Sequence, residues 1–282
     1  MNQHTQAEQA KLIEEAIAGN KEVLENLLAS VQDLIFNLSL RMLGTIPDAE
    51  DATQEILIKV MTRLSTFRNE SAFTTWVFRI AGNHLLNYRK NMFAQHPLSF
   101  EYYGEDILSG REKDIPDMSQ GVDHSLLEQE LKLSCSNVML QCLDTESRCI
   151  FILGTMFKVD SRVAGEILGL TPEAYRKKLS RARRKMADFL KVYCGLSGSG
   201  SCSCKKRIHY AAATHRLNPD NLEYSALEAS QEVLKDCVTA MEQIDDLSLV
   251  FSNFPTYRAT PAAKQFLTEF LRSDCYSLIA NI

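Results

Sequence analysis

The chain of 282 residues lacks several features that mark other classes of protein. It contains no run of about 18 apolar residues, so we expect no membrane-spanning helix and no insertion into a membrane. Its first twenty residues contain no basic stretch followed by an apolar core, so we expect no secretory signal and a cytoplasmic location. Glycine and proline are scarce, at 12 and 7 residues. Because helical periodicity runs through most long segments, the sequence predicts an all-α fold.

Patterns typical of catalysis are also missing. The sequence has no glycine-rich loop that would hold a phosphate, and its six histidines are scattered without the spacing of a metal site or a catalytic triad. We therefore predict that the protein is not an enzyme and that it needs no cofactor, apart from a zinc alternative in its C-terminal part.

The net charge of -5 is unevenly distributed along the chain. Residues 125–192 carry 12 basic and 8 acidic groups, whereas residues 96–124 carry 2 basic and 7 acidic groups. Charge and periodicity together predict two small helical domains, residues 1–95 and residues 125–192. An acidic linker without helical periodicity, residues 96–124, joins them, and residues 193–282 form a C-terminal helical extension.

The basic charge is concentrated in the stretch "GLTPEAYRKKLSRARRKM", where seven residues between Arg176 and Lys185 are Lys or Arg. A short amphipathic helix precedes this stretch, Gly169 can end that helix, and Thr171 can cap the next one. Two helices joined by about three residues that include glycine form a helix-turn-helix, whose second helix enters the major groove of DNA. A merely solvated basic face is the alternative.

A second polar face lies in "FTTWVFRIAGNHLLNYRK", residues 73–90. On a helical wheel the apolar residues fall on one side, and Trp76, Arg79 and Asn83 fall on the other with no acidic residue among them. Such a face suits base stacking and phosphate contact with a DNA strand. A core position for Trp76 is the alternative.

Two segments resemble a known family, the bacterial RNA polymerase sigma factors of the extracytoplasmic-function type. The segment "DAEDATQEILIKVMTRLSTFRNESAFTTWVFRIAGNHLLNYRK", residues 48–90, resembles region 2 of that family. The segment "LDTESRCIFILGTMFKVDSRVAGEILGLTPEAYRKKLSRARRKM", residues 143–186, resembles region 4. The resemblance covers roughly residues 8–192. It implies a promoter-specificity subunit that binds core RNA polymerase and promoter DNA, recognises the −10 and −35 elements and helps melt the duplex.

The resemblance also implies roles for individual residues. Contacts with core polymerase fall to Asp51, Gln54, Glu55 and Lys59. Contacts with the −10 element and the melting duplex fall to Phe67, Arg68, Asn69, Trp76, Arg79, Asn83 and Lys90. For the −35 element, the resemblance implies contacts by Arg176, Lys177 and Arg181. The helix-turn-helix interpretation completes the predicted set, which is Thr171, Glu173, Arg176, Lys177, Ser180, Arg181 and Arg184.

The sequence departs from the short form of this family after Leu190. In the extension, Cys194, Cys202, Cys204 and His209 could supply four zinc ligands, although their spacing is not that of a standard zinc finger. Redox pairing of the cysteines, or cysteines without a ligand, are the alternatives. The segments 225–245 and 260–274 are predicted to be amphipathic helices. A regulatory extension, or a separate anti-sigma partner, could control the protein.

Two other classes of function compete with the sigma-factor interpretation. A one-component helix-turn-helix regulator would use the extension as a sensor or dimerisation module, but it would not explain the "DAED" and "QE" residues or the Trp76 face. A protein-interaction adaptor could bind an acidic partner through the basic helix. The capped helix-turn-helix counts against the adaptor.

Overall fold

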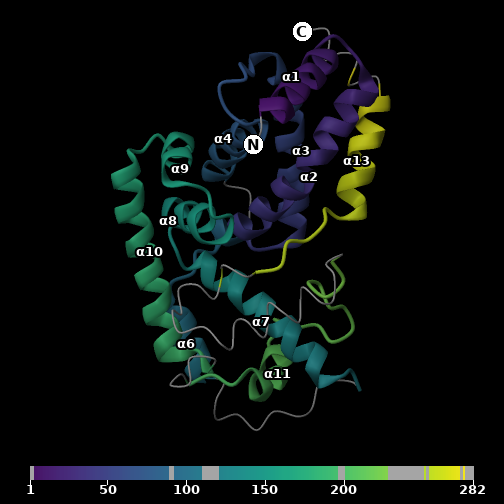
Figure 1. Ribbon diagram of the computed structural model, residues 1–282. Helices are drawn as coiled ribbons and strands as arrows, with labels where there is room; N and C mark the ends of the chain where they lie inside the picture. Colours follow the sequence, from purple (N-terminus) through teal and green to yellow (C-terminus); the bar gives the residue numbers. More distant parts are fainter. Residues whose placement is uncertain are drawn as a thin grey trace.

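The computed structural model describes residues 3–88, 92–109, 121–195, 201–227, 251, 254–273 and 276. Within these residues every regular element is a helix, which confirms the all-α prediction (Figure 1). No helix in this described part of the chain has the length and hydropathy needed to cross a membrane.

The N-terminal helices surround α2, which is the longest of them. Their bounds are Gln3–Ile17 (α1), Lys21–Leu43 (α2), Ile46–Thr62 (α3) and Phe73–Leu86 (α4), with a short 3-10 turn, η1, at Leu64–Thr66. The side chain of Asn20 caps the start of α2 by accepting a hydrogen bond from Val23 N. Gly44 ends the helix in the left-handed conformation, with φ of 86°. These two caps fix the length of the central helix.

The middle of the chain forms a second group of helices. Their bounds are Met92–Gln95 (α5), Phe100–Ser109 (α6), His124–Gln141 (α7), Thr145–Phe151 (α8), Ser161–Leu168 (α9) and Pro172–Tyr193 (α10), with a π-helical turn, η2, at Ile152–Met156. The helix α6 lies inside residues 96–124, where we predicted no helical periodicity. It forms because Tyr103 and Ile107, one helical turn apart, are both buried. The ring of Tyr103 stacks on Phe189 of α10 at 5.7 Å between centroids.

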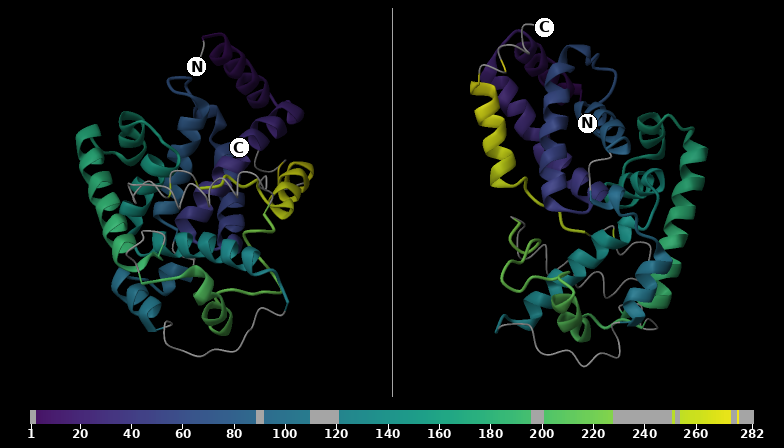
Figure 2. Two further views of the ribbon diagram at one scale, coloured as in Figure 1. Left: turned by 60° about the horizontal axis from the view of Figure 1, so that its bottom comes forward. Right: turned by 180° about the vertical axis from the view of Figure 1, so that it is seen from behind.

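The two predicted helical domains pack directly against each other. Helix α9 lies against α4, and a single apolar cluster contains residues from α1 to α4 and from α7 to α10. The rings of Phe78 on α4 and Phe157 meet edge to face at 5.3 Å. The close neighbourhood of α4, α8, α9 and α10 is visible in two of the views (Figures 1 and 2).

The extension packs on both groups of helices. Helix α11 (Cys204–Ala213) lies against α7, and helix α13 (Pro261–Arg272) lies against α2 and α3 (Figure 2). Helix α13 confirms the amphipathic helix predicted at 260–274, whereas most of the helix predicted at 225–245 lies outside the described residues. Asn37 of α2 holds the segment before α13, since it donates to Tyr257 O at 2.6 Å and accepts from Tyr257 N at 2.9 Å.

A buried carboxylate joins α6 to the extension. Asp106 accepts a hydrogen bond from Tyr210 Oη at 2.9 Å and pairs with the guanidinium groups of Arg207 and Arg216. Burial acts to raise the pKa of Asp106, but the hydrogen bonds from Arg216 and Tyr210 and the charges of both arginines outweigh it and hold the pKa below its ordinary value.

We expect the Asp106→Asn variant to lose about 2 kcal/mol of unfolding free energy at pH 7, because two arginines lose their acidic partner. A lowered pKa stabilises the folded state fully above the unfolded-state pKa, near 3.8 for an Asp, and the stabilisation disappears as the pH falls through the folded-state pKa. Urea unfolding at a series of pH values should therefore show that the unfolding free energies of the two proteins become equal as the pH falls below the folded-state pKa of Asp106. The exposed Asp188→Asn change is the control, and an equal loss in both variants would contradict the prediction.

Candidate nucleic-acid interface

The turn between α9 and α10 has the geometry that the sequence predicted. Gly169 adopts φ of 66°, and the side chain of Thr171 accepts a hydrogen bond from Ala174 N at 3.2 Å. The turn packs closely against α9, because a Cβ atom added to Gly165 would lie 2.6 Å from Leu170 O. Two helices, a three-residue turn and a capped second helix are therefore all present.

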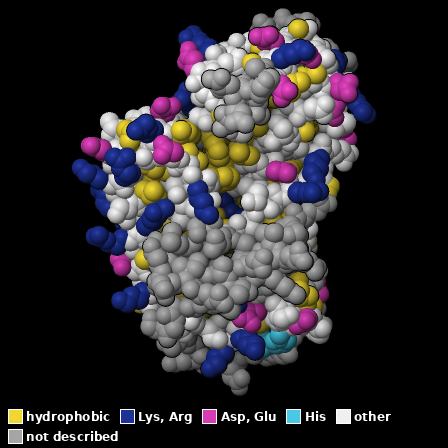
Figure 3. Space-filling view, in the orientation of Figure 1, with side chains coloured by type: hydrophobic (Ala, Val, Ile, Leu, Met, Phe, Trp, Pro, Cys, Tyr) yellow, Lys and Arg dark blue, Asp and Glu magenta, His cyan; other side chains and the backbone are white. Residues whose placement is uncertain are grey.

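Helix α10 separates a buried stripe from an exposed basic face. Tyr175, Ala182 and Met186 are buried, and Tyr175 Oη donates to Ile150 O at 3.0 Å. All seven residues predicted to contact the −35 element are exposed: Thr171, Glu173, Arg176, Lys177, Ser180, Arg181 and Arg184. Lys and Arg side chains gather along the edge of the molecule over α9 and α10 (Figure 3). The exposed face is therefore positive and open to solvent.

Not every cation of α10 faces solvent in this way. Lys178 pairs with Glu146 of α8 at 2.6 Å, and Arg183 donates to Thr155 Oγ1 at 3.1 Å and to Gly154 O at 3.2 Å. These two side chains hold α10 against α8 and η2. Part of the basic charge of α10 therefore stabilises its packing. The sequence pattern alone did not distinguish these two residues from the exposed cations that are predicted to contact DNA.

The residues predicted to contact the −10 element lie on α4 and the loop before it. Trp76 is half-buried and contacts the rings of Phe67 and Phe73, at 5.5 and 5.8 Å between centroids. Arg68, Asn69 and Asn83 are exposed. Lys90 lies outside the described residues. The structure thus brings Phe67 and Trp76, the two aromatic residues among the predicted −10 contacts, together at the N-terminal end of α4. The half-buried position of Trp76 is compatible both with a DNA contact and with the alternative of a core residue.

Helix α9 covers one side of α4. Arg79 Nη2 lies 3.7 Å from Glu166 Oε2, and a Cβ atom added to Gly82 would lie 3.4 Å from Ile167. The side chains of Arg79 and Glu166 are 43% and 62% exposed, so we assign this ion pair only about 0–1 kcal/mol. One predicted DNA-binding arginine is therefore engaged by the neighbouring helix through a weak contact.

The residues predicted to bind polymerase lie on α3. Asp51 is exposed, whereas Gln54, Glu55 and Lys59 are half-buried. Glu55 and Lys59 both reach His84 of α4, whose Nε2 lies 3.3 Å from Glu55 Oε2 and whose Nδ1 lies 2.5 Å from Lys59 Nζ. The sequence analysis did not single out His84. His84 could have been found from the helical wheel, because it is a polar residue on the side of α4 that is otherwise apolar.

The first ten residues of α3 carry an acidic surface made of Asp48, Asp51 and Glu55. Burial raises the pKa of Tyr88, and the carboxylates of Glu55, Asp51 and Asp48 raise it further, in that order. Three acidic side chains of α3 therefore act on one phenol at the end of α4. Three carboxylates on this surface favour a partner that presents positive charge.

The zinc interpretation of the extension gains no support. Among the described residues, no group of three or more His, Cys, Asp and Glu is placed to hold a metal ion. His209 follows Cys204 by five residues on α11, which turns it by roughly 140° around the helix. Its ring lies 5.6 Å from that of His124 on α7. The four predicted ligands therefore do not form one site.

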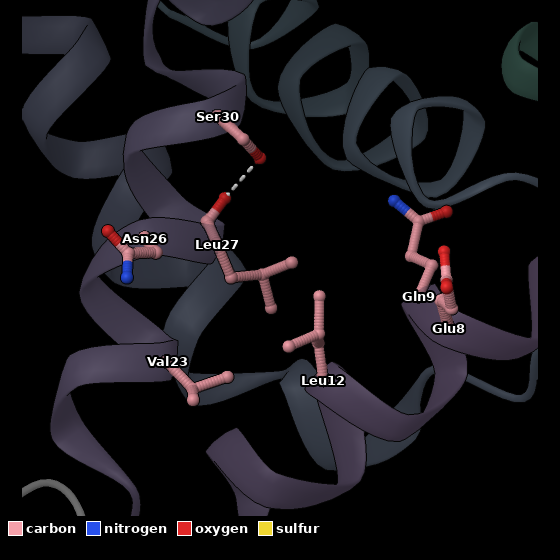
Figure 4. A pocket seen from close by; sticks show the side chains of 7 residues that line it. All are labelled: Glu8, Gln9, Leu12, Val23, Asn26, Leu27 and Ser30. Atoms are coloured by element: carbon pink, nitrogen blue, oxygen red, sulfur yellow. Dashed lines mark hydrogen bonds between the residues drawn. The ribbon is translucent and has the colours of Figure 1, made fainter. Parts of the chain in front are cut away.

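A pocket of about 380 Å³ lies between α1 and α2. Its lining residues are Glu8, Gln9, Leu12, Val23, Asn26, Leu27 and Ser30 (Figure 4). The side chains of Leu12, Val23 and Leu27 point toward one another across it. No residue of the predicted nucleic-acid or polymerase surfaces lines this pocket.

Comparison with known proteins adds independent evidence. Residues 27–91 match the family model described as Sigma-70 region 2. The ECF RNA polymerase sigma factor SigW of Bacillus subtilis is 24% identical over 183 residues, which make up 64% of this chain and 96% of SigW. The RNA polymerase sigma-H factor of Pseudomonas aeruginosa is 36% identical over 84 residues, 30% of this chain and 44% of that protein. A solved structure of CnrH in complex with the cytosolic domain of CnrY covers 64% of this chain and 94% of that one, with a TM-score of 0.45 and 23% identity.

The helical fold and the match to region 2 together define a protein of transcription initiation. More specifically, the chain is similar to sigma factors of the extracytoplasmic-function type, and its residues 27–91 match their region 2. The alternative of a one-component regulator leaves the region 2 match at residues 27–91 without an explanation.

Proposed function

We propose that this sigma factor directs core RNA polymerase to promoters by reading the −35 element with α10 and the −10 element with α4 and the loop before it. The observation that carries the proposal is the face of α10, where all seven predicted contact residues are exposed beside a capped turn. In helix-turn-helix docking the N-terminal half of the second helix meets base edges. Residues 27–91 supply the region 2 that this function needs.

Co-elution of the purified chain with bacterial core RNA polymerase, followed by run-off transcription from a promoter library, tests this function. Stable co-elution with initiation at a subset of promoters supports the proposal and gives the promoter motif. Binding of duplex DNA by a dimer that ignores polymerase would favour the one-component regulator instead. A chain that binds polymerase but initiates at every template equally would contradict promoter selection by α10 and α4.

The docked extension supports control within the same chain. Thr260, at the start of α13, donates a hydrogen bond to Glu50 of α3, next to the predicted polymerase contact Asp51. Gln32 of α2 donates to Ala263 O at 2.7 Å. Because α13 borders the acidic surface of α3, we infer that the extension affects access of polymerase to that surface. A separate anti-sigma partner stays an expectation from the resemblance.

We expect Arg176→Ala to weaken binding to the cognate −35 sequence by about 1–3 kcal/mol and to relax the preference at one base position. Among the described residues, the exposed guanidinium forms its hydrogen bond with Ser161 Oγ, at 3.1 Å, so the fold should be retained. Binding is measured with polymerase holoenzyme on promoters mutated at single −35 positions. Lys178→Ala on the same helix is the control, since Lys178 pairs with Glu146. Equal weakening on every sequence would instead identify Arg176 as a phosphate contact.

A further inference from the structure

Four cysteines lie in the region where the extension leaves the helix-turn-helix. Cys135 lies on α7, Cys194 directly follows α10, and Cys202 and Cys204 lie at the start of α11. Burial raises the pKa of Cys204, and Cys135, Cys202 and Cys194 are close enough to raise it further. None of these four cysteines is part of a disulfide in the structure. The proposed promoter recognition uses none of them.

Cys194 and Cys202 are neighbours through their backbones. Cys202 N donates to Tyr193 O at 2.8 Å, and Cys202 O lies 1.9 Å from the position of a Cβ atom added to Gly195. The backbone of Cys202 therefore lies alongside residues 193–195, with Cys194 at the centre. A direct backbone hydrogen bond between the two segments is compatible with the roughly 4.4–6.8 Å that a disulfide requires between Cα atoms.

The other two thiols of the group are less suited to oxidation. Cys135 accepts a hydrogen bond from Tyr103 Oη at 2.9 Å, and burial raises its pKa. Burial likewise raises the pKa of Cys204. Both groups are therefore held as thiols, which react slowly with oxidants. All four thiols are partly exposed, so exposure does not separate them, but Cys194 and Cys202 also have exposed flanking residues, Gly195 and Ser203.

We propose that Cys194 and Cys202 form a reversible disulfide when the protein meets a hydroperoxide. The thiolate of one cysteine attacks the peroxide and becomes a sulfenic acid, and the peroxide leaves as water or an alcohol. The thiolate of the other cysteine attacks the sulfenic sulfur, and the sulfur–sulfur bond forms with release of water. The peroxide is reduced by two electrons and the two thiols are oxidised by two. A small dithiol reverses the reaction.

The bond would connect the end of α10 to the start of the extension. Tyr193 packs tightly there, because a Cβ atom added to Gly104 of α6 would lie 2.4 Å from its ring, and the ring of Phe189 lies 4.8 Å away. Oxidation therefore ties the end of the helix that carries the proposed −35 contacts to the start of α11. The pairing is independent of the proposed function, since it depends only on the two thiols and the backbone around them.

The test uses the reduced full-length chain, treated with increasing amounts of hydrogen peroxide, alkylated and mapped by peptide mass spectrometry. We expect one linked pair of peptides, Cys194 with Cys202, about 2 Da lighter than the two thiol peptides together and restored by dithiothreitol. Cys194→Ser and Cys202→Ser should each abolish the linked pair. Cys149→Ser, a buried position on α8, should leave it unchanged.

Other results of the same experiment would overturn the proposal. These are a linked pair that involves Cys135, Cys204, Cys237 or Cys275 in place of the proposed one, or over-oxidation of Cys194 and Cys202 to sulfinic acids without a link. A link that forms only after the chain is unfolded in guanidinium would also overturn it. In the folded protein the oxidised form should melt roughly 5 °C above the reduced form, because the bond restricts the unfolded chain.

Discussion

Replacing Arg148 by methionine should lower the free energy of unfolding by about 3–5 kcal/mol. The buried guanidinium donates four hydrogen bonds to main-chain carbonyls. Nε reaches Leu140 O at 2.9 Å, Nη1 reaches Met42 O at 2.6 Å, and Nη2 reaches Gln141 O at 3.0 Å and Leu143 O at 2.9 Å. Methionine fills much of the same volume but donates no hydrogen bond, so four carbonyls in a buried region lose their donor.

The position of Arg148 explains the size of the effect. Its acceptors lie at the C-terminal ends of α2 and α7, where the last carbonyls of a helix have no partner within the helix. A cation is also favourable at that end of the helix dipole. Burial lowers the pKa of Arg148 to about 10, so the side chain still carries its charge at neutral pH. One residue of α8 thus joins α2 of region 2 to the helices that follow α7.

Arg162→Met is the matched control, because Arg162 is exposed at the start of α9. We expect the control to change the unfolding free energy by less than about 0.5 kcal/mol. Urea unfolding and thermal unfolding of both variants measure the difference, and Arg148→Met should lower the melting temperature by roughly 10 °C. If both variants unfold alike, the junction between α2, α7 and α8 does not depend on Arg148.

Local features of the sequence predicted the end of α9 and the capped start of α10. Gly169 and Thr171 act on their own neighbours, and the left-handed turn and the N-cap need no distant partner. The same holds for α13, where Thr260 caps and Pro261 starts the helix. Helix α6 was missed, because Tyr103 and its neighbours form a helix only where α10 supplies an apolar surface.

Contacts between distant segments could not be predicted from local patterns. Arg41 looks like a surface residue of α2, yet it is 2% exposed. It donates to Asn137 Oδ1 and to Pro255 O, both at 2.8 Å, and lies 4.3 Å from the centre of the Phe254 ring. Pro255 follows Arg41 by 214 residues. No periodicity within α2 carries information about such a partner, and the docking of α9 on α4 was missed for the same reason.

Reversing the charge of Asp51 should weaken binding to core RNA polymerase by about 2–3 kcal/mol, roughly 30- to 150-fold in Kd. Asp51 is exposed on the acidic surface of α3, next to the docked start of α13. A positive side chain there would repel a partner that presents positive charge to the acidic surface of α3. Glu55 is a poorer site for the test, because its carboxylate lies 3.3 Å from the buried His84 and a change there also disturbs α4.

Fluorescence anisotropy of labelled Asp51→Arg with core polymerase measures the loss, and the unfolding curve of the variant shows that its fold is retained. Glu14→Arg is the control, since Glu14 is also an exposed acid but lies on α1, away from the surface of α3. The two variants have the same net charge, so long-range attraction changes equally in both. A larger loss in Asp51→Arg therefore identifies a local contact. Equal Kd values for the two variants would exclude Asp51 from the interface even if the wild-type chain binds polymerase tightly.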